Sequence, residues 1–236
     1  MADTADSLAA VKKVVFDDKK ITMAKLIDAL DKNFEGYDDV RHLLSNAPKF
    51  GNDDDFVDTI MMAVNDNAAE TVRSHTSTMG FKNVTSAQSM TANMPLGALM
   101  GALPDGRKAG EPLAECISPH QGRSSSGPTA TLRSVAKIDH SKMTHGSILN
   151  MRFNPDALKD DQKIRKFAAL LRTFFETGGD LVQFNIIDAA TLRAAQKNPD
   201  KYRDLIVRVA TYSAYFVELG KEAQDDIIAR TEFENV

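Results

Sequence analysis

Apolar residues recur at helical spacing through roughly the first third of the chain. Within residues 7–34 this spacing predicts two helices, with Thr22 placed to cap the start of the second and Gly36 placed to end it. A third helix ends before Pro48, and a fourth begins after a run of aspartates. The N-terminal third is therefore predicted to be helical. The apolar positions that define these helices are Leu8, Val11 and Val15; Leu26, Ile27, Leu30 and Phe34; Val40, Leu43 and Leu44; and Phe56, Ile60 and Val64.

Three consecutive aspartates, Asp53, Asp54 and Asp55, precede the fourth predicted helix. A carboxylate at this place accepts hydrogen bonds from the free N–H groups of the first turn and is stabilised by the helix dipole. A calcium-binding loop is the alternative, but such a loop needs a central glycine and a terminal glutamate that this segment lacks. The pattern favours helix capping.

After Gly80 the chain becomes rich in glycine, proline and serine. Short runs of β-branched or apolar residues stand out at 129–138 and 148–153. Between these runs the composition is typical of turns and loops. We therefore expect two strands here, joined by long ordered loops.

The last third alternates between helical and strand-like patterns. Asn154 and Pro155 are placed to open a helix that Gly178 and Gly179 end. A buried strand is predicted at 181–187, a short helix at about 189–198, an apolar run at 205–210, a turn containing Thr211, and a final helix at about 221–230. Together with the preceding segment, this alternation predicts an α/β protein.

Composition and charge narrow the classes of partner. The chain has 236 residues, 42% of them hydrophobic and 26% charged, which is enough apolar material for a substantial core. Its net charge is −4 and no basic block is present, so we expect no nucleic-acid partner. No apolar run approaches the about 18 residues that a membrane span needs, and the first residues lack the order of a signal peptide. We therefore expect no membrane association and a cytoplasmic location.

Few side chains show a pattern that marks a chemical site. The single cysteine, Cys116, excludes an internal disulfide, and the histidines have no paired ligand spacing, so we expect no protein-bound metal. Cys116 lies in an apolar context that favours core packing over a role as nucleophile. The serines at 124–126 lack the lysine of a phosphate-binding loop, and the carboxylates show no spacing of an acid–base pair.

Several long motifs nevertheless resemble one family. "GALPDGRKAGEPLAE", "ISP", "GPTATLRSVAKID", "LVQFNIID" and "RVATYSAYFVEL" followed by "QDDIIART" are similar to the C-terminal portion of glycyl radical enzymes of the pyruvate formate-lyase and diol-dehydratase-like superfamily. The resemblance implies the C-terminal part of a ten-stranded β/α barrel. It also implies a helical, barrel-associated segment at 1–109 and a glycine-radical domain at 110–236.

The resemblance further implies a mechanism. In this family a radical S-adenosylmethionine activating enzyme removes a hydrogen atom from the α-carbon of a loop glycine. The resulting glycyl radical oxidises a cysteine on a facing loop, and the thiyl radical then takes a hydrogen atom from a small-molecule substrate. C–C, C–O, C–N or C–S cleavage follows. The implied partners are the activating enzyme, the substrate, and either the upstream barrel chain or a second copy of this chain. The resemblance implies no bound cofactor, and we expect the protein-based glycyl radical of the family to be absent here.

This sequence departs from the family at the radical residue. Arg208, Val209, Ala210 and Tyr212 match the radical motif, but Thr211 stands where the resemblance places the glycine. A glycyl radical is stable only if its α-carbon flattens, and the β-branched side chain of threonine opposes this. If the turn needs a positive φ, threonine is also strained there. The facing cysteine loop lies outside this chain, and the resemblance does not place Cys116 in it.

Three functions remain open from the sequence. The chain is the C-terminal part of a radical lyase or dehydratase, inactive as written; or a non-catalytic, spare-part subunit that docks on a longer enzyme chain; or a relative that binds a molecule without radical chemistry. The first reading leads. It predicts a tight turn within residues 208–216, with the Thr211 side chain in a confined space.

Overall fold

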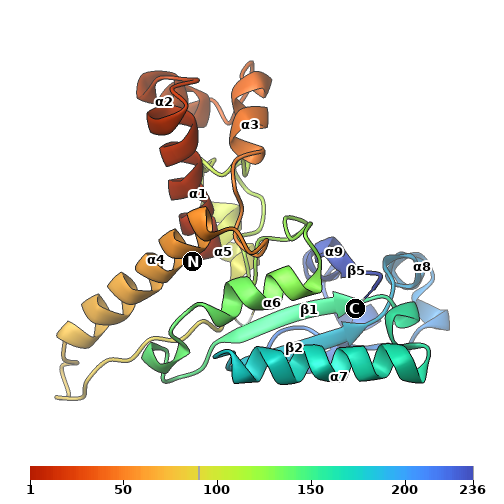
Figure 1. Ribbon diagram of the computed structural model, residues 1–236. Coiled ribbons are helices and arrows are strands. Elements are labelled where there is room, and N and C mark those ends of the chain that lie inside the picture. The colour runs from red at the N-terminus through yellow and green to blue at the C-terminus, as the bar shows by residue number, and fades with distance from the viewer. Residues whose placement is uncertain (90, 236) are drawn as a thin grey trace.

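The computed structural model describes residues 1–89 and 91–235 (Figure 1). Its α-helices are α1 (Ala2–Val11), α2 (Met23–Asp31), α3 (Asp38–Ser45), α4 (Asp55–Ser74), α5 (Asn93–Leu99), α6 (Pro128–Ala136), α7 (Asp161–Glu176), α8 (Ala189–Lys197) and α9 (Lys221–Ala229). Its strands are β1 (Ile148–Phe153), β2 (Leu181–Ile186), β3 (Ile206–Arg208), β4 (Ser213–Tyr215) and β5 (Glu232–Phe233). The chain is an α/β protein with a helical N-terminal third, as predicted.

The first helices form an arm that projects from the rest of the molecule (Figure 1). α1 continues as a wider π-helical segment, Lys12–Asp17, and α2 and α3 pack beside it around a small core of their own. The side chain of Thr22 accepts a hydrogen bond from the Lys25 N–H at 3.1 Å, which confirms the predicted cap. Gly36 has a φ of +75°, but α2 ends at Asp31, so the prediction that Gly36 ends this helix is wrong.

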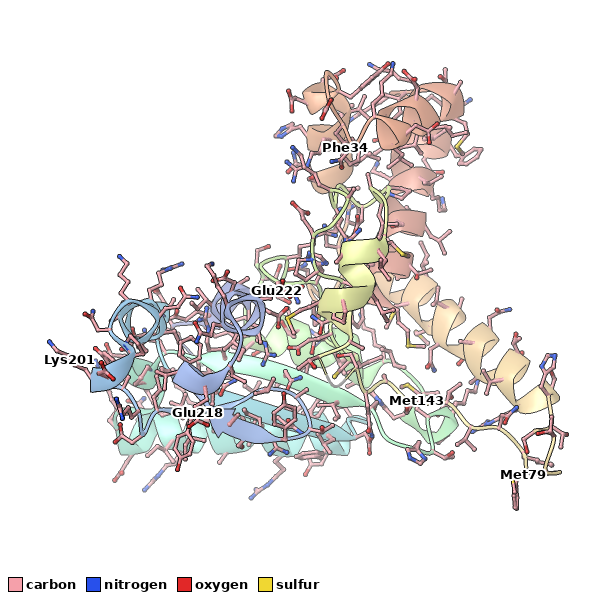
Figure 2. The ribbon with its side chains drawn as sticks, turned by 180° about the vertical axis from the view of Figure 1, so that it is seen from behind. Phe34, Met79, Met143, Lys201, Glu218 and Glu222 are labelled. Carbon is pink, nitrogen blue, oxygen red and sulfur yellow. The ribbon has the colours of Figure 1, made fainter. Side chains whose placement is uncertain are left out.

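α4 runs away from the base of the arm. Asp54 caps it by accepting a hydrogen bond from the Phe56 N–H at 2.9 Å, which confirms the capping role of the aspartate run. Met79 lies at the outer tip that follows this helix (Figure 2). No helix among the described residues combines the length and the apolar character needed to cross a membrane.

The main core surrounds a parallel sheet of order β2-β1-β5. β1 is central, and Ile148 pairs with Leu181 at the start of its register with β2. The ring of Phe153 lies 5.3 Å from that of Phe167 on α7 and 5.5 Å from that of Phe233 on β5. Side chains from α1, α4, α6 and α7 complete this core, so the N-terminal helices and the sheet share one hydrophobic cluster.

The C-terminal residues build a smaller layer beside the sheet. β3 and β4 form a separate antiparallel hairpin. α8, α9 and the hairpin bury a third cluster around Leu192, Val207, Phe216 and Ile227. The hairpin is therefore supported by its own apolar layer, outside the hydrogen-bond ladder of the main sheet.

Two predicted elements differ from the structure. Residues 129–138 were expected to be a strand, but α6 occupies most of this range because Pro128 begins a helix whose Thr131, Leu132 and Val135 are buried on one face. Asn154 caps a short 3₁₀ turn, Pro155–Leu158, and the long helix α7 begins only at Asp161. The division of the chain at 109/110 stays a prediction.

Candidate functional site at the β3–β4 hairpin

Thr211 lies at the tip of the β3–β4 hairpin. Arg208 pairs with Ser213 at the end of the ladder, and the Val209 N–H donates to the Tyr212 carbonyl at 3.0 Å. The tight turn expected here is therefore present. Thr211 keeps a negative φ and is partly exposed, and Tyr212 is 41% exposed. The turn therefore does not need a positive φ at Thr211, so that source of strain does not apply, and the confinement of its side chain stays a prediction.

Arg230 holds the hairpin from the end of α9. Its Nη2 donates to the Val209 carbonyl at 2.5 Å, and its Nη1 donates to the Arg208 carbonyl at 3.3 Å. The planar guanidinium presents several donors in a fixed fork, which suits two neighbouring carbonyls. The side chain is only 6% exposed, so water does not compete strongly for these bonds.

Two buried carboxylates face the same guanidinium. Arg230 Nη2 lies 2.8 Å from Glu115 Oε2 and 3.4 Å from Asp226 Oδ2. Asp226 is held in turn by Asn93 and Gln121, whose amides donate to its other oxygen at 3.0 and 2.6 Å. One positive charge thus faces two carboxylates in a buried space. Burial raises the pKa of Glu115 to about 8, with Arg230 opposing the shift and Asp226 adding to it.

This pKa predicts how stability changes with pH. The folded chain binds one more proton at Glu115 than the unfolded chain between the ordinary pKa of 4.5 and the folded pKa of about 8. The contribution of Glu115 to the free energy of unfolding therefore falls as the pH rises through this window. In Glu115→Gln, we expect that fall to be smaller, as measured by urea unfolding across the window. The exposed Glu176→Gln is the matched control, and equal slopes for Glu115→Gln and the unmodified chain would contradict the prediction.

Side chains of β2 attach the hairpin to the main sheet. The Asn185 amide donates to the Arg208 carbonyl at 2.7 Å and accepts from the Arg208 N–H at 2.7 Å. Gln183 accepts a further bond from Arg208 Nε at 2.8 Å. Asn185 therefore supplies the pair of bonds that a neighbouring strand would otherwise give.

Cys116 packs beneath the hairpin. It is 8% exposed and forms a small apolar cluster with Ile148 and Ala210. Ser89 lies against the sulfur, with its N–H 3.4 Å from Sγ. Burial raises the pKa of this thiol, which disfavours the thiolate that a nucleophile needs. The prediction of core packing is confirmed.

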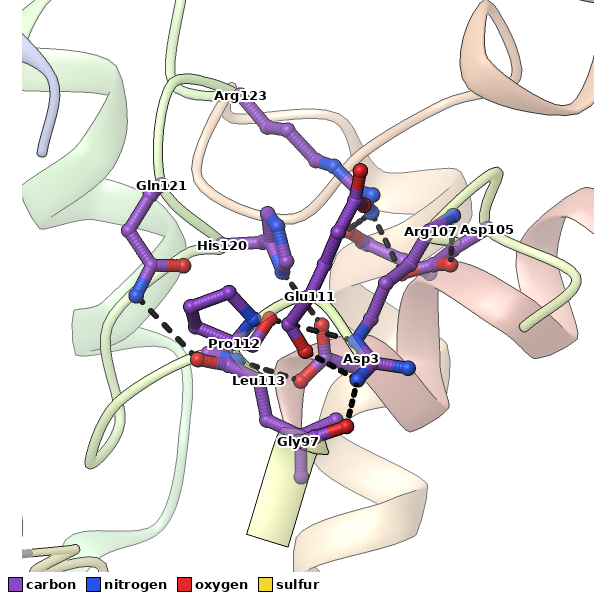
Figure 3. Close-up of polar contacts among 12 residues, drawn as sticks. Asp3, Gly97, Asp105, Arg107, Glu111, Pro112, Leu113, His120, Gln121 and Arg123 are labelled. Atoms are coloured by element: carbon purple, nitrogen blue, oxygen red, sulfur yellow. Dashed lines mark hydrogen bonds and ion pairs between the residues drawn. The ribbon is translucent and has the colours of Figure 1, made fainter. Parts of the chain in front are cut away.

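The loop before Cys116 is organised by Arg107, which is fully buried (Figure 3). Its guanidinium donates to the carbonyls of Gly97, Gly101, Glu111 and Pro112. The same glycine- and proline-rich segment that carries the family resemblance is therefore fixed by one arginine.

Within the described residues, Asp3, Asp105 and His120 bring three potential metal ligands together, a grouping that sequence spacing does not reveal. His120 Nδ1 lies 2.6 Å from Asp3, and Arg123 lies 2.6 Å from Asp105 (Figure 3). These carboxylates thus already have charged or ionisable partners, and the guanidinium of Arg123 disfavours an added cation.

The predicted site residues lie together, but the residues that hold them were missed. Arg208, Val209, Ala210, Thr211 and Tyr212 form the end of β3 and the turn, as the motif requires. The sequence did not single out the buried supporting side chains Glu115, Asn185, Asp226 and Arg230. All four lie within the motifs quoted above, and Asp226 and Arg230 also have the i, i+4 spacing of a helical ion pair.

Two family models match this chain. The model described as "Pyruvate formate lyase-like" matches residues 1–97, and the model described as "Glycine radical" matches residues 113–217. The second range includes the hairpin and the loop that carries Glu115.

Individual relatives match almost the whole chain. The trans-4-hydroxy-L-proline dehydratase of Clostridioides difficile is 44% identical over 228 residues, covering 96% of this chain and 29% of the relative. The isethionate sulfite-lyase of Bilophila wadsworthia is 43% identical over 232 residues, covering 96% of this chain and 28% of the relative. The solved structure of the glycerol-bound, B12-independent glycerol dehydratase from Clostridium butyricum has a TM-score of 0.96 and 46% identity, covering 99% of this chain and 30% of that one. The chain therefore belongs to the glycyl radical enzymes and corresponds to their C-terminal portion, spanning less than a third of the length of these relatives.

Proposed function

We propose that this chain is the C-terminal part of an anaerobic radical lyase or dehydratase and that Thr211 occupies the position of the radical glycine. The observation that carries the proposal is the place of Thr211, at the tip of a tight hairpin turn within the range of the glycine-radical match. Arg208, Val209, Ala210 and Tyr212 surround it in the order of the family's motif.

The chemistry explains why the chain as written is inactive under this proposal. The activating enzyme would remove one hydrogen atom from the α-carbon of residue 211, and the unpaired electron would spread over the flanking amides only if that carbon became planar. The branched Cβ of Thr211 would then crowd the adjacent backbone. The cysteine that receives the radical lies on the upstream barrel, and the buried thiol of Cys116 does not replace it.

The upstream barrel would decide which substrate binds and which bond is cleaved. The relatives include enzymes named as dehydratases, sulfite-lyases and a decarboxylase, so the proposal extends to a small-molecule substrate and to C–C, C–O, C–N or C–S cleavage as a class.

A second candidate function is a non-catalytic or spare-part subunit that docks on a longer glycyl radical enzyme chain. Exposed apolar side chains on this chain favour its docking on another polypeptide. They lie on the arm, on the tip beyond α4, on α5 and at the hairpin: Phe16, Met79, Phe81, Leu99 and Ile206 are 60, 79, 66, 87 and 59% exposed. Burial of such side chains against a partner is a large driving force for association.

Association in solution tests both candidates. We expect the isolated chain to self-associate, and to form a defined one-to-one complex when a polypeptide carrying the upstream barrel is added, because that barrel would cover the exposed apolar side chains. Size-exclusion chromatography with light scattering measures both states. A monodisperse monomer that forms no complex with the added barrel polypeptide would contradict the proposal. Leu99→Ser and Met79→Ser should each weaken the complex, whereas Glu176→Gln, at an exposed polar side chain, is the comparison that should leave it unchanged.

A further inference from the structure

We infer that Arg230 is a positioning residue that fixes the turn at residues 209–212, and with it residue 211, relative to the main sheet. The inference rests on the proposed function, because it assigns the hairpin tip a place that must be held accurately. It concerns a residue outside the radical motif, in the segment that follows α9.

In this turn Arg230 supplies a hydrogen-bond donor to the Val209 carbonyl. In common β-turns the carbonyl of the first residue accepts from the N–H of the fourth. Here the Val209 N–H donates to the Tyr212 carbonyl, and the Val209 carbonyl accepts from Arg230 at 2.5 Å. Because Val209 is 1% exposed, losing the guanidinium would leave a buried carbonyl without this donor.

Side chains rather than a backbone ladder join the hairpin to the sheet. The side chain of Asn185 on β2 bonds to both the N–H and the carbonyl of Arg208. Arg230 donates to the carbonyls of Arg208 and Val209. The backbone carbonyl of Arg230 itself accepts from Arg152 Nη2 at 2.5 Å, and Arg152 belongs to the central strand β1. A continuous path of hydrogen bonds therefore runs from the centre of the sheet through Arg230 to the turn.

Two buried acidic side chains hold the guanidinium in this place. Glu115 from the loop before α6 and Asp226 from α9 face it at 2.8 and 3.4 Å. Arg152 is the second buried cation nearby, and it lies 3.5 Å from Glu232 on β5. A lysine at 230 would keep the positive charge facing Glu115 and Asp226, but its single nitrogen lacks the planar fork that bonds two carbonyls at once. Charge and geometry can therefore be separated by substitution.

Amide hydrogen exchange on the full chain tests the inference without any radical. The Val209 amide bonds across the turn and the Phe216 amide bonds across the far end of the hairpin. The Ile187 amide, bonded to the Phe153 carbonyl, reports on the main sheet. In Arg230→Met, we expect exchange at Val209 to accelerate about tenfold or more, with a smaller change at Ile187.

Arg230→Lys is the decisive variant, because the retained charge should preserve the fold even if Arg230→Met does not fold. We expect it to keep near-native exchange at Ile187 while exchange at Val209 stays fast. Arg203→Lys, at an arginine whose side chain is 78% exposed and paired with Asp200, is the matched control and should change neither amide.

Two outcomes would overturn the inference. The first is native protection of Val209 in Arg230→Lys, which would mean that Arg230 only balances charge. The second is equal acceleration at Val209 and Ile187, which would mean that Arg230 supports the whole fold rather than the turn. If these exchange results hold but Thr211→Gly forms no radical, the proposed function fails and the positioning role stands.

Discussion

A glycyl radical doublet is expected in the electron paramagnetic resonance spectrum of Thr211→Gly after incubation without oxygen with a radical S-adenosylmethionine activating enzyme and reductant. The unmodified chain should give none. Glycine lets the α-carbon become planar, so the unpaired electron spreads over the flanking amides, whereas the β-branched side chain of Thr211 opposes that geometry. The effect is the presence or absence of the signal.

Thr211→Ala is the matched control, because it removes the branch and keeps a Cβ. It should also give no glycyl doublet, since that doublet requires the α-hydrogen that only glycine retains. A doublet from the unmodified chain, or its absence from a folded Thr211→Gly chain that binds the activating enzyme, would refute the assignment of residue 211.

The activated Thr211→Gly chain should still turn over no substrate alone. Turnover should appear only when a polypeptide carrying the upstream barrel and its cysteine is added, because the radical then has an acceptor. Turnover by the unmodified chain alone would overturn the proposed function.

The turn itself does not demand a glycine. Thr211 keeps a negative φ, a conformation that any residue adopts, and its side chain is partly exposed. Thr211→Gly should therefore change the free energy of unfolding by only about 1 kcal/mol, mainly through the greater freedom of glycine in the unfolded chain. The requirement for glycine in the family would then be chemical rather than conformational.

Local patterns predicted most of the fold. Thr22 and Asp54 cap helices because capping depends on a few adjacent residues. A strand is also present at Leu181–Ile186, but the prediction that it is buried is wrong, since Leu181 and Ile186 are 38 and 41% exposed. The segment 129–138 was wrongly predicted to be a strand because its threonine, alanine and valine residues are compatible with strand structure. Pro128 favours the first position of a helix, and a helix forms there. Gly36 was wrongly expected to end the second helix because the apolar pattern continues to Phe34, whereas α2 ends at Asp31.

The supporting residues of the site could not be predicted in the same way. Glu115 and Arg230 are 115 positions apart, and nothing local marks either of them as buried. Asn185 sits in a strand that reads as apolar, where an amide has no local reason to be. Its role emerges only when β3 lies beside β2 and needs partners for the Arg208 backbone. Long-range pairing of this kind is set by the topology, which the family resemblance indicated and residue periodicity did not.

A large loss of stability is expected when Arg107 is replaced by methionine. Arg107 is fully buried, and its guanidinium donates to four backbone carbonyls in the segment that links α5 to the loop before Glu115. Methionine fills similar space but donates nothing, so these carbonyls would lose their charged donor. We expect Arg107→Met to lower the free energy of unfolding by about 3–5 kcal/mol, measured by urea unfolding.

Arg107→Lys and Arg165→Met make the comparison specific. The lysine keeps the charge, but its three donors radiate from one nitrogen and cannot reach carbonyls on different sides, so its loss should be intermediate. Arg165 is an exposed arginine of α7, and its replacement should cost about 0.5 kcal/mol or less. If Arg107→Met were as mild as Arg165→Met, the four carbonyls would be finding other donors, and Arg107 would not be what fixes this loop.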